Sequence, residues 1–420
     1  MIKPNAPSQV KRTSAHRRRH VAVLELGTCK VACIIAETPL AGETDERAII
    51  TGFGYHRGEG LRGGHVTHMV EAERAIRAAV DGAERMAETA VSDLIVSISP
   101  DRLMSRIATV EISLNQQIVT DEHVVMAMRH ATEQLYHTDY DILHAIPIDY
   151  AVDESRRLHD PRGLIGQVLR VDVHVISVPI APLQNIRACL ERCHLDVQKF
   201  ILSPYASALA TLTADEMDLG VLHLEMGGST TGYSVFFEGH PVLCGVVPAG
   251  AHHITRDLAH GLGVPLATAE RIKNLVGSAL STTHGADEID VASDGDEPVM
   301  VQYDALTKII RPRLEETFEL VKQNLSKSDL AQLAGRRMVL SGGGASLNGA
   351  REFAQHYFDR TVRVATPMRL NGLPDMAAHT AFSGAAGAVA YARKADQTAL
   401  PAMPLLSRWS NIGQWLKLNF

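Results

Sequence analysis

The sequence predicts an α/β protein made of two related halves, and three glycine-containing segments carry this prediction. Residues 21–30 and 221–235 resemble each other: an apolar run leads to a glutamate, a glycine turn with hydroxyl side chains and a second apolar run. Each therefore indicates a β-hairpin. In the third segment, residues 338–349, a short apolar strand leads through three consecutive glycines into a helical pattern.

The three glycine turns have the chemistry of a phosphate-binding site. Glycine lets the backbone approach a phosphate closely, and consecutive turn N–H groups form a concavity that binds anions. A single glycine turn more often belongs to a hairpin without a ligand. Two matching hairpins, followed by a helical stretch and a third glycine turn, are much more specific. They predict a nucleotide that is bound between two related half-domains and contacts both.

The size and composition are those of a globular protein with more than one domain. The chain has 420 residues, of which 45% are hydrophobic and 21% charged. A net charge of −7 argues against nucleic-acid binding by bulk charge. The five cysteines are an odd number without a CxxC pair, which favours reduced thiols over a disulfide framework. The histidine pairs at residues 65/68 and 252/253 lack further ligands at metal spacing, so we predict no metal site there.

Residues 1–20 form a basic arm that contains no acidic residue. No apolar core of a signal peptide follows, because Glu25 and Lys30 interrupt the next stretch. We expect a disordered, solubilising arm, with a weak attraction to anionic lipid as the alternative.

Residues 21–93 and 176–214 are expected to form a first core domain. After the first hairpin, the pattern predicts a strand over 48–55 and an amphipathic helix over 69–87. The second part is predicted to contain, in order, helix 180–193, strand 197–203 and helix 205–212. Such alternation is typical of an α/β core.

Residues 94–175 differ in character and predict an inserted α+β subdomain. Its expected elements are strands 94–99, 106–114 and 168–178 and helix 120–135, with a segment 140–152 and a Pro/Gly turn at 160–163 before the last strand.

A second core domain is expected from residues 215–255 and 331–395, which contain the second hairpin and the third glycine segment. Between these parts lies a mostly helical subdomain, 256–330. It contains an acidic stretch and a long amphipathic helix over 303–325.

The C-terminal tail is predicted to be a separate module. A linker with two prolines, 396–404, leads to residues 405–420, which hold both tryptophans of the chain. At helical spacing the apolar side chains share one face: Leu405, Trp409, Ile412, Trp415, Leu416 and Phe420. Sixteen residues span only about 24 Å as a helix, which is too short to cross a bilayer. We therefore expect an amphipathic helix that lies in the lipid interface, in preference to a terminal helix docked on its own domain.

Together these motifs resemble the actin/Hsp70/sugar-kinase superfamily and, within it, the bacterial cell-division actin family FtsA. Three segments resemble the superfamily's two phosphate loops and its adenosine motif: 25–30, 225–231 and 340–349. Residues 253–259 and 269–273 resemble the segment that reaches the ribose and the adenine. Residues 144–150 and 160–166 carry the signature of the FtsA-specific insert. The resemblance covers nearly all of residues 21–395, and the tail matches the family's membrane-targeting helix.

The resemblance implies an actin-like two-domain ATPase fold with a family-specific α+β insert and a C-terminal amphipathic helix. It implies ATP and Mg²⁺ as cofactors. The implied phosphate contacts are Gly27, Thr28, Cys29, Lys30, Gly227, Gly228, Ser229 and Thr230. The implied nucleoside contacts are Glu270, Lys273, Gly342, Gly343 and Gly344. Glu25 and Glu225 are the implied catalytic residues and would hold Mg²⁺ through water.

Two departures from the pattern concern hydrolysis. Glu25 and Glu225 stand where the superfamily's loops have aspartates, and each carboxylate is one methylene longer. Cys29 replaces a threonine hydroxyl. Since Mg²⁺ demands near-octahedral geometry, we expect ATP binding with weak or absent ATPase activity. The matched change in both loops favours a site that has adapted over one that is damaged.

The resemblance implies a polymer-forming protein at the division site, peripheral to the cytoplasmic face of the inner membrane. It would anchor the tubulin-like protein FtsZ through that protein's C-terminal peptide, which the subdomain 256–330 would receive. The insert would meet later division proteins and the next subunit. The alternatives are a soluble small-metabolite kinase of the same superfamily and a pilus-assembly actin relative. The sequence shows no separate candidate base for a kinase, and the amphipathic tail argues against both.

Overall fold

The computed structural model describes residues 18–39, 48–280, 287–290, 300–368 and 370–397. Most of the predicted basic arm and linker lie outside these residues. The whole predicted membrane-targeting helix, with Leu405, Trp409, Ile412, Trp415, Leu416 and Phe420, also lies outside them. Among the helices of the described residues, none combines the length and the apolar character needed to cross a membrane.

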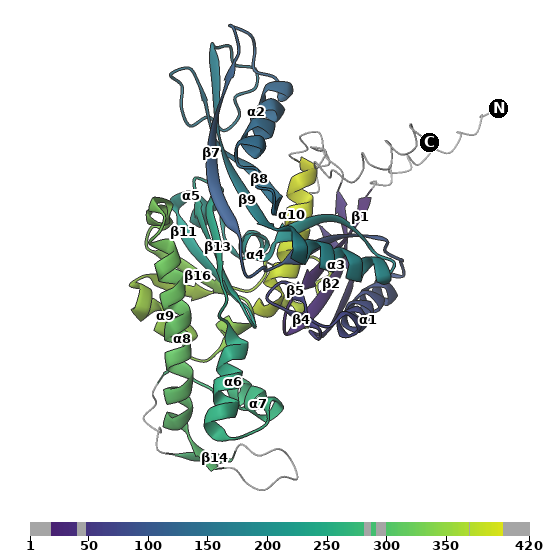
Figure 1. Cartoon of the computed structure of the whole chain (residues 1–420), viewed down its shortest axis with the longest axis vertical. Helices are drawn as coiled ribbons and strands as arrows, with labels where there is room; N and C mark the ends of the chain where they lie inside the picture. The colour runs from purple at the N-terminus through teal and green to yellow at the C-terminus, as the bar shows by residue number, and fades with distance from the viewer. Residues whose placement is uncertain (1–17, 40–47, 281–286, 291–299, 369, 398–420) are drawn as a thin grey trace, which may run out of the picture.

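Two five-stranded sheets with the same topology form the core of the molecule (Figure 1). The first has the order β10-β6-β1-β2-β3, and the second β17-β16-β11-β12-β13. In each, a three-stranded antiparallel meander continues into two parallel strands. The first sheet comprises β1 (Arg18–Leu26), β2 (Lys30–Pro39), β3 (Ile49–Arg57), β6 (Asp93–Ile98) and β10 (Asp196–Leu202). The second comprises β11 (Val221–Met226), β12 (Thr231–Phe237), β13 (His240–Val247), β16 (Arg337–Ser341) and β17 (Thr361–Val364). The two related halves predicted from the hairpins are confirmed.

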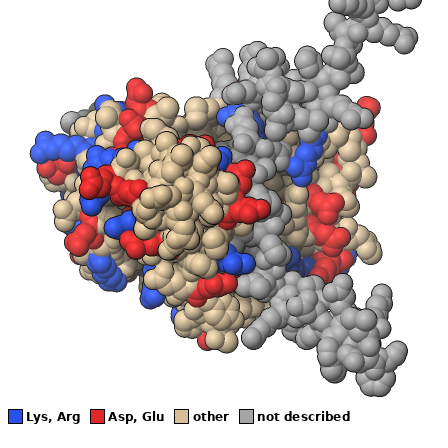
Figure 2. Space-filling model, turned by 90° about the horizontal axis from the view of Figure 1, so that it is seen from above, with Lys and Arg blue, Asp and Glu red and all other residues tan. Residues whose placement is uncertain are grey.

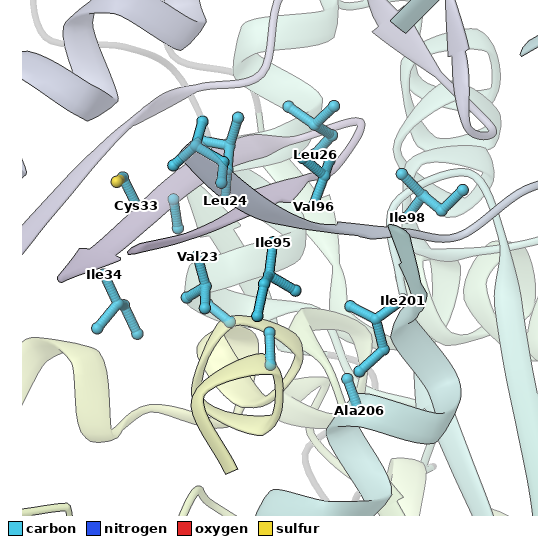
Figure 3. Close-up of a cluster of buried hydrophobic side chains, with 14 of the residues drawn as sticks. Val23, Leu24, Leu26, Cys33, Ile34, Ile95, Val96, Ile98, Ile201 and Ala206 are labelled. Carbon is cyan, nitrogen blue, oxygen red and sulfur yellow. The ribbon is translucent and has the colours of Figure 1, made fainter. Parts of the chain in front are cut away.

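The first sheet is buried on both faces, as its continuous apolar strands require. Val23 and Ile95 point toward α10 (Ser383–Gln397), and Leu24 and Val96 point to the opposite face (Figure 3). Helix α1 (Met69–Ala87) covers that side with a stripe of small and branched side chains that includes Ala72, Ile76 and Ala79. The remaining helices around this sheet are α3 (Ile180–Arg192) and α4 (Ser203–Thr211).

Helices α4 and α10 lie between the two sheets (Figure 1). Their backbones approach closely at Gly387, where any Cβ atom would collide with the carbonyl oxygen of Ala206. Glycine at this position therefore allows the crossing on which the two halves are joined. The second half adds α5 (Ala214–Leu219) and α9 (Ala350–Phe358).

The insert projects from one end of the molecule as a three-stranded antiparallel sheet, β7-β9-β8, covered by α2 (Asp121–Gln134). Its strands are β7 (Met104–Ser113), β8 (Tyr140–Val152) and β9 (Val168–Pro179). Residues 94–98, which the sequence placed in the insert, belong instead to β6 of the first sheet, paired with β1 and β10. The face at the insert end mixes acidic and basic side chains around an uncharged area (Figure 2).

The opposite end is largely helical. It contains α6 (Ala251–Leu262), α7 (Leu266–Val276) and α8 (Tyr303–Leu325), with the small hairpin β14 (Glu288–Asp290) and β15 (Met300–Gln302) beyond them (Figure 1). Leu306, Ile310, Leu314 and Phe318 of α8 are buried at helical spacing against the second core.

Candidate nucleotide-binding site

A cavity of about 680 Å³ opens where the strand ends of the two sheets face each other. This volume suits a ligand of nucleotide size. Its walls come from both hairpin turns, the start of α6, helix α7 and the glycine segment after β16. Most of the residues predicted from the sequence line it: Glu25, Gly27, Thr28, Cys29, Lys30, Glu225, Gly227, Gly228, Thr230, Glu270, Lys273, Gly342, Gly343 and Gly344.

The two hairpin turns have the same geometry. The N–H of Gly27 donates to the carbonyl of Lys30 at 2.9 Å, and the N–H of Gly227 donates to the carbonyl of Thr230 at the same distance. A Cβ atom at Gly27 or Gly227 would lie 2.7 or 2.8 Å from that carbonyl oxygen. Glycine is therefore needed in both turns for the hairpin to close, and it leaves the turn backbone open to the cavity.

The turns contact each other through hydroxyl groups. Thr28 Oγ1 lies 2.6 Å from Ser229 Oγ, which also accepts the N–H of Gly63 at 2.9 Å. Gly63 lies in the turn between β4 (Leu61–Arg62) and β5 (His65–Val66). Ser99, just after β6, places its Oγ 3.1 Å from Thr230 Oγ1. Four loops from the two halves thus meet at this end of the cavity, where the sequence predicts the phosphates.

Both glutamates are nearly buried and are held by protein groups. Lys30 Nζ donates to Glu25 Oε2 at 2.7 Å, and Ser203 Oγ donates to Glu225 Oε1 at 2.9 Å. Burial raises the pKa of Glu225 to about 8, and the nearby carboxylate of Glu25 adds to the shift. Glu225 is therefore largely protonated at neutral pH, whereas Glu25 forms an ion pair with Lys30.

The opposite end of the cavity carries a second charged group. Lys273 Nζ donates to Glu270 Oε2 at 2.7 Å and to Thr255 Oγ1 at 2.9 Å. Burial alone would raise the pKa of Glu270, but hydrogen bonds from Lys273 and Thr255 hold it below its ordinary value. Gly342 has φ +81°, and a Cβ atom there would lie 2.6 Å from the carbonyl oxygen of Met226. Glycine is therefore required for this loop to pack on β11.

One predicted residue does not face the cavity. Ser229 turns instead toward Thr28 and Gly63, as its hydrogen bonds show. Several residues of the cavity wall were not predicted from the sequence: Gly64, Ser99, Ser203, Asn274, Tyr303, Asn348, His379 and Ala381. Apart from Asn348, which lies in the third glycine segment, they belong to none of the glycine motifs, and only the fold brings them to the cavity. Ser99 and Ser203 come directly after the buried strands β6 and β10. This position at a strand end was the sequence signal that could have identified them.

Among the described residues, no cluster of three or more histidine, cysteine, aspartate or glutamate side chains has a geometry suited to a metal ion. All five cysteines are free, and only Cys29 is exposed.

Comparison with known proteins identifies the family. Residues 222–387 match the model of the cell division protein FtsA, and residues 101–177 match that of the SHS2 domain inserted in FtsA. FtsA of Agrobacterium fabrum is 38% identical over 98% of this chain and 97% of its own length. FtsA of Neisseria meningitidis is 35% identical over 88% and 89%, and that of Escherichia coli K12 29% identical over 95% and 96%.

Solved structures share the architecture. A structure of the PilM–PilN type IV pilus biogenesis complex matches with a TM-score of 0.63 at 15% identity, over 91% of this chain and 100% of that chain. MreB5 of Spiroplasma citri bound to ADP matches with a TM-score of 0.53 at 13% identity, over 90% and 98%. The actin-like fold with its insert, predicted from the motifs, is confirmed. This chain belongs to the FtsA family of cell division proteins.

Proposed function

We propose that this protein binds ATP in the cavity between the two sheets and tethers FtsZ to the cytoplasmic face of the inner membrane during division. The observation that carries the nucleotide part is the convergence of both hairpin turns and the third glycine segment on one cavity. The bound ADP of the similarly folded MreB5 structure supports the same choice of ligand.

In this proposal the phosphates lie against the two hairpin turns. Gly27, Gly227 and Gly228 bring the turn backbone to the cavity wall there, and Lys30 supplies the positive charge. The nucleoside lies toward Gly342, Gly343 and Gly344, with Glu270 and Lys273 beside the ribose and base. Cys29, Thr28 and Thr230 complete the walls of the phosphate end.

The residues at the phosphate end suit Mg²⁺. Glu25 and Glu225 bring two carboxyl groups close enough for Glu25 to raise the pKa of Glu225, and a cation relieves such repulsion. Glu25 and Glu225 would hold the ion through water, and it would screen the charge of the phosphates. Lys30 and Ser203 already bind these carboxyl groups, so we expect weak or absent ATPase activity.

The tether depends on parts at both ends of the molecule. The helical subdomain with α6, α7 and α8 would receive the C-terminal peptide of FtsZ. At the insert, Ile118 and Ile165 form an isolated bridge and are 52% and 67% exposed, so they offer an apolar surface to the next subunit or to later division proteins. Residues 405–420 would hold the protein on the lipid surface through their apolar face.

Flotation of purified FtsZ with anionic liposomes tests the tether. We expect FtsZ to float only when this protein is present. The Trp409→Glu/Trp415→Glu variant should abolish flotation, because it places charge at the acyl boundary, while ATP still raises the melting temperature of the body. A Ser410→Glu/Gln414→Glu variant on the polar side is the matched control. Flotation of FtsZ with the tryptophan variant would reject the membrane role of the tail.

A further inference from the structure

The start of α10 contacts the phosphate end of the cavity in a way that no glycine motif predicts. Lys30 Nζ lies 5.1 Å from the ring centroid of Phe382, one residue before α10 begins. Glu25, which binds Lys30 at 2.7 Å, lies against Gly384 in the first turn of α10. One short segment therefore touches both members of the ion pair.

Gly384 leaves the space that the Glu25 carboxyl group occupies. A Cβ atom at this position would lie 2.8 Å from Glu25 Oε1, 3.0 Å from Glu25 Cδ and 2.7 Å from Ser203 Oγ. Gly384 is helical and has no left-handed φ angle, so the backbone itself does not require glycine. Because glycine is a poor helix former, its place here is explained by the fit to the side chains of Glu25 and Ser203.

The same segment also reaches the nucleoside loop. The carbonyl of Thr380 accepts the N–H of Gly342 at 3.1 Å, and the methyl group of Ala381 lies 3.7 Å from the position of a Cβ atom at Gly343. Residues 380–384 therefore connect the first hairpin with the glycine segment after β16.

We propose that Phe382 and Gly384 are positioning residues of the nucleotide site, an inference that rests on the proposed function. The ring of Phe382 attracts the ammonium group of Lys30 through its electron-rich face. Gly384 has no side chain, and this leaves the space beside Lys30 in which the carboxylate of Glu25 lies. Together they hold the Lys30–Glu25 ion pair, whose side chains are only 18% and 10% exposed, at the phosphate end of the cavity.

The rate at which Lys30 is acetylated in the absence of nucleotide reports whether Lys30 remains paired with Glu25. We expect limiting acetic anhydride to modify Lys30 about tenfold faster in Gly384→Ala and Phe382→Leu than in the wild type, the scale of losing one charge-assisted hydrogen bond. Lys273, which is also paired with a glutamate in the cavity wall, is the internal control and should react at the wild-type rate. An unchanged Lys30 rate, or an equal rise at Lys273, would overturn the proposal.

A double-mutant cycle tests the fit between Gly384 and Glu25. Glu25→Asp removes one methylene, so the methyl group of Gly384→Ala should destabilise the Glu25→Asp protein less than the wild type in urea unfolding. Should Gly384→Ala alone not fold, a Ser203→Ala background removes the other close contact; recovery of a folded protein on adding Glu25→Asp there supports the proposal, and failure to recover overturns it. Equal costs in the two backgrounds would also overturn it, as would relief by Ser203→Ala instead of Glu25→Asp.

Both measurements are made without nucleotide. They therefore test the positioning role of Phe382 and Gly384 separately from the proposed binding of ATP. If the ion pair moves as expected but the wild type does not bind ATP, the proposed function fails and the positioning by α10 stands. In the opposite case, ATP binding remains and the role of Phe382 and Gly384 is rejected. When both hold, ATP affinity should fall in Gly384→Ala by about the same factor as the acetylation rate rises.

Discussion

Thr28 and Ser229 lie in hairpin turns of different sheets, 201 residues apart, and their hydroxyl oxygens are 2.6 Å from each other. Ser229 also binds the N–H of Gly63. This contact joins the two hairpin turns directly, at the point where the proposed phosphates would lie between them.

Removing this hydroxyl contact should loosen the junction between the halves. We expect Thr28→Ala to lower the free energy of unfolding by about 1 kcal/mol, the usual net value of one hydrogen bond, and Ser229→Ala to lower it further, because Ser229 also accepts the N–H of Gly63. The two losses should not add, because both variants remove the same contact. Urea unfolding of both single variants and the double variant measures the coupling. Strictly additive losses would mean that the two hydroxyl groups do not interact.

Shortening both glutamates should not create a faster ATPase. Lys30 binds Glu25 and Ser203 binds Glu225 at 2.7 and 2.9 Å, and these contacts use the full length of the glutamate side chains. In the Glu25→Asp/Glu225→Asp variant we therefore expect ATP turnover to stay flat or to fall. Steady-state phosphate release checks this. A gain above about tenfold, or about 1.4 kcal/mol in the barrier, would show that the long carboxylates misplace the metal.

Acid should weaken the attachment of the insert at His174. This buried side chain of β9 places Nδ1 2.7 Å from the carbonyl oxygen of Pro241 in β13 and Nε2 2.7 Å from Ser105 Oγ in β7. Burial lowers the pKa of His174 from 6.5 to about 4, although the contact with Pro241 opposes the shift. Between these values the unfolded chain binds a proton that the folded protein does not. Stability is therefore present above pH 6.5 and is lost as the pH falls toward 4, by about 1.4 kcal/mol per pH unit.

His174→Gln removes this titration and gives the matched comparison. Its free energy of unfolding should depend less on pH than that of the wild type between pH 6.5 and 4. Urea unfolding across this range, followed by circular dichroism, measures both slopes. Parallel slopes would show that His174 takes up its proton equally well in the folded protein.

Helices with a long apolar period were predictable to the residue. The predicted ranges 69–87 and 303–325 coincide with α1 and α8, since each buries one stripe at helical spacing. Strand β6 was predicted as a strand but assigned to the insert. A short, unbroken apolar run does not say which sheet it joins, and only its pairing with β1 and β10 decides this.

The residues of the candidate site also fall into two groups, those that local sequence predicts and those that only tertiary packing brings to the site. Gly27, Gly227 and Gly342 were predictable because a local turn requires glycine there. Ser203, Phe382 and Gly384 were not, because they reach Glu225, Lys30 and Glu25 only through tertiary packing. The pairing of each glutamate with Lys30 or Ser203 likewise depends on side-chain geometry that sequence spacing does not contain.

Thermal unfolding with and without ATP tests the central claim, nucleotide binding between the hairpins, most directly. Millimolar ATP with Mg²⁺ should raise the melting temperature of the wild type, since a ligand at one hundred times its Kd adds about 2.7 kcal/mol. A Cβ atom at Gly343 would meet only the methyl group of Ala381, so Gly343→Val should fill the nucleoside end without disturbing the core. This variant should melt near the wild type without ATP and show no shift with it. The absence of a shift in the wild type, or an equal shift in both proteins, would contradict the account.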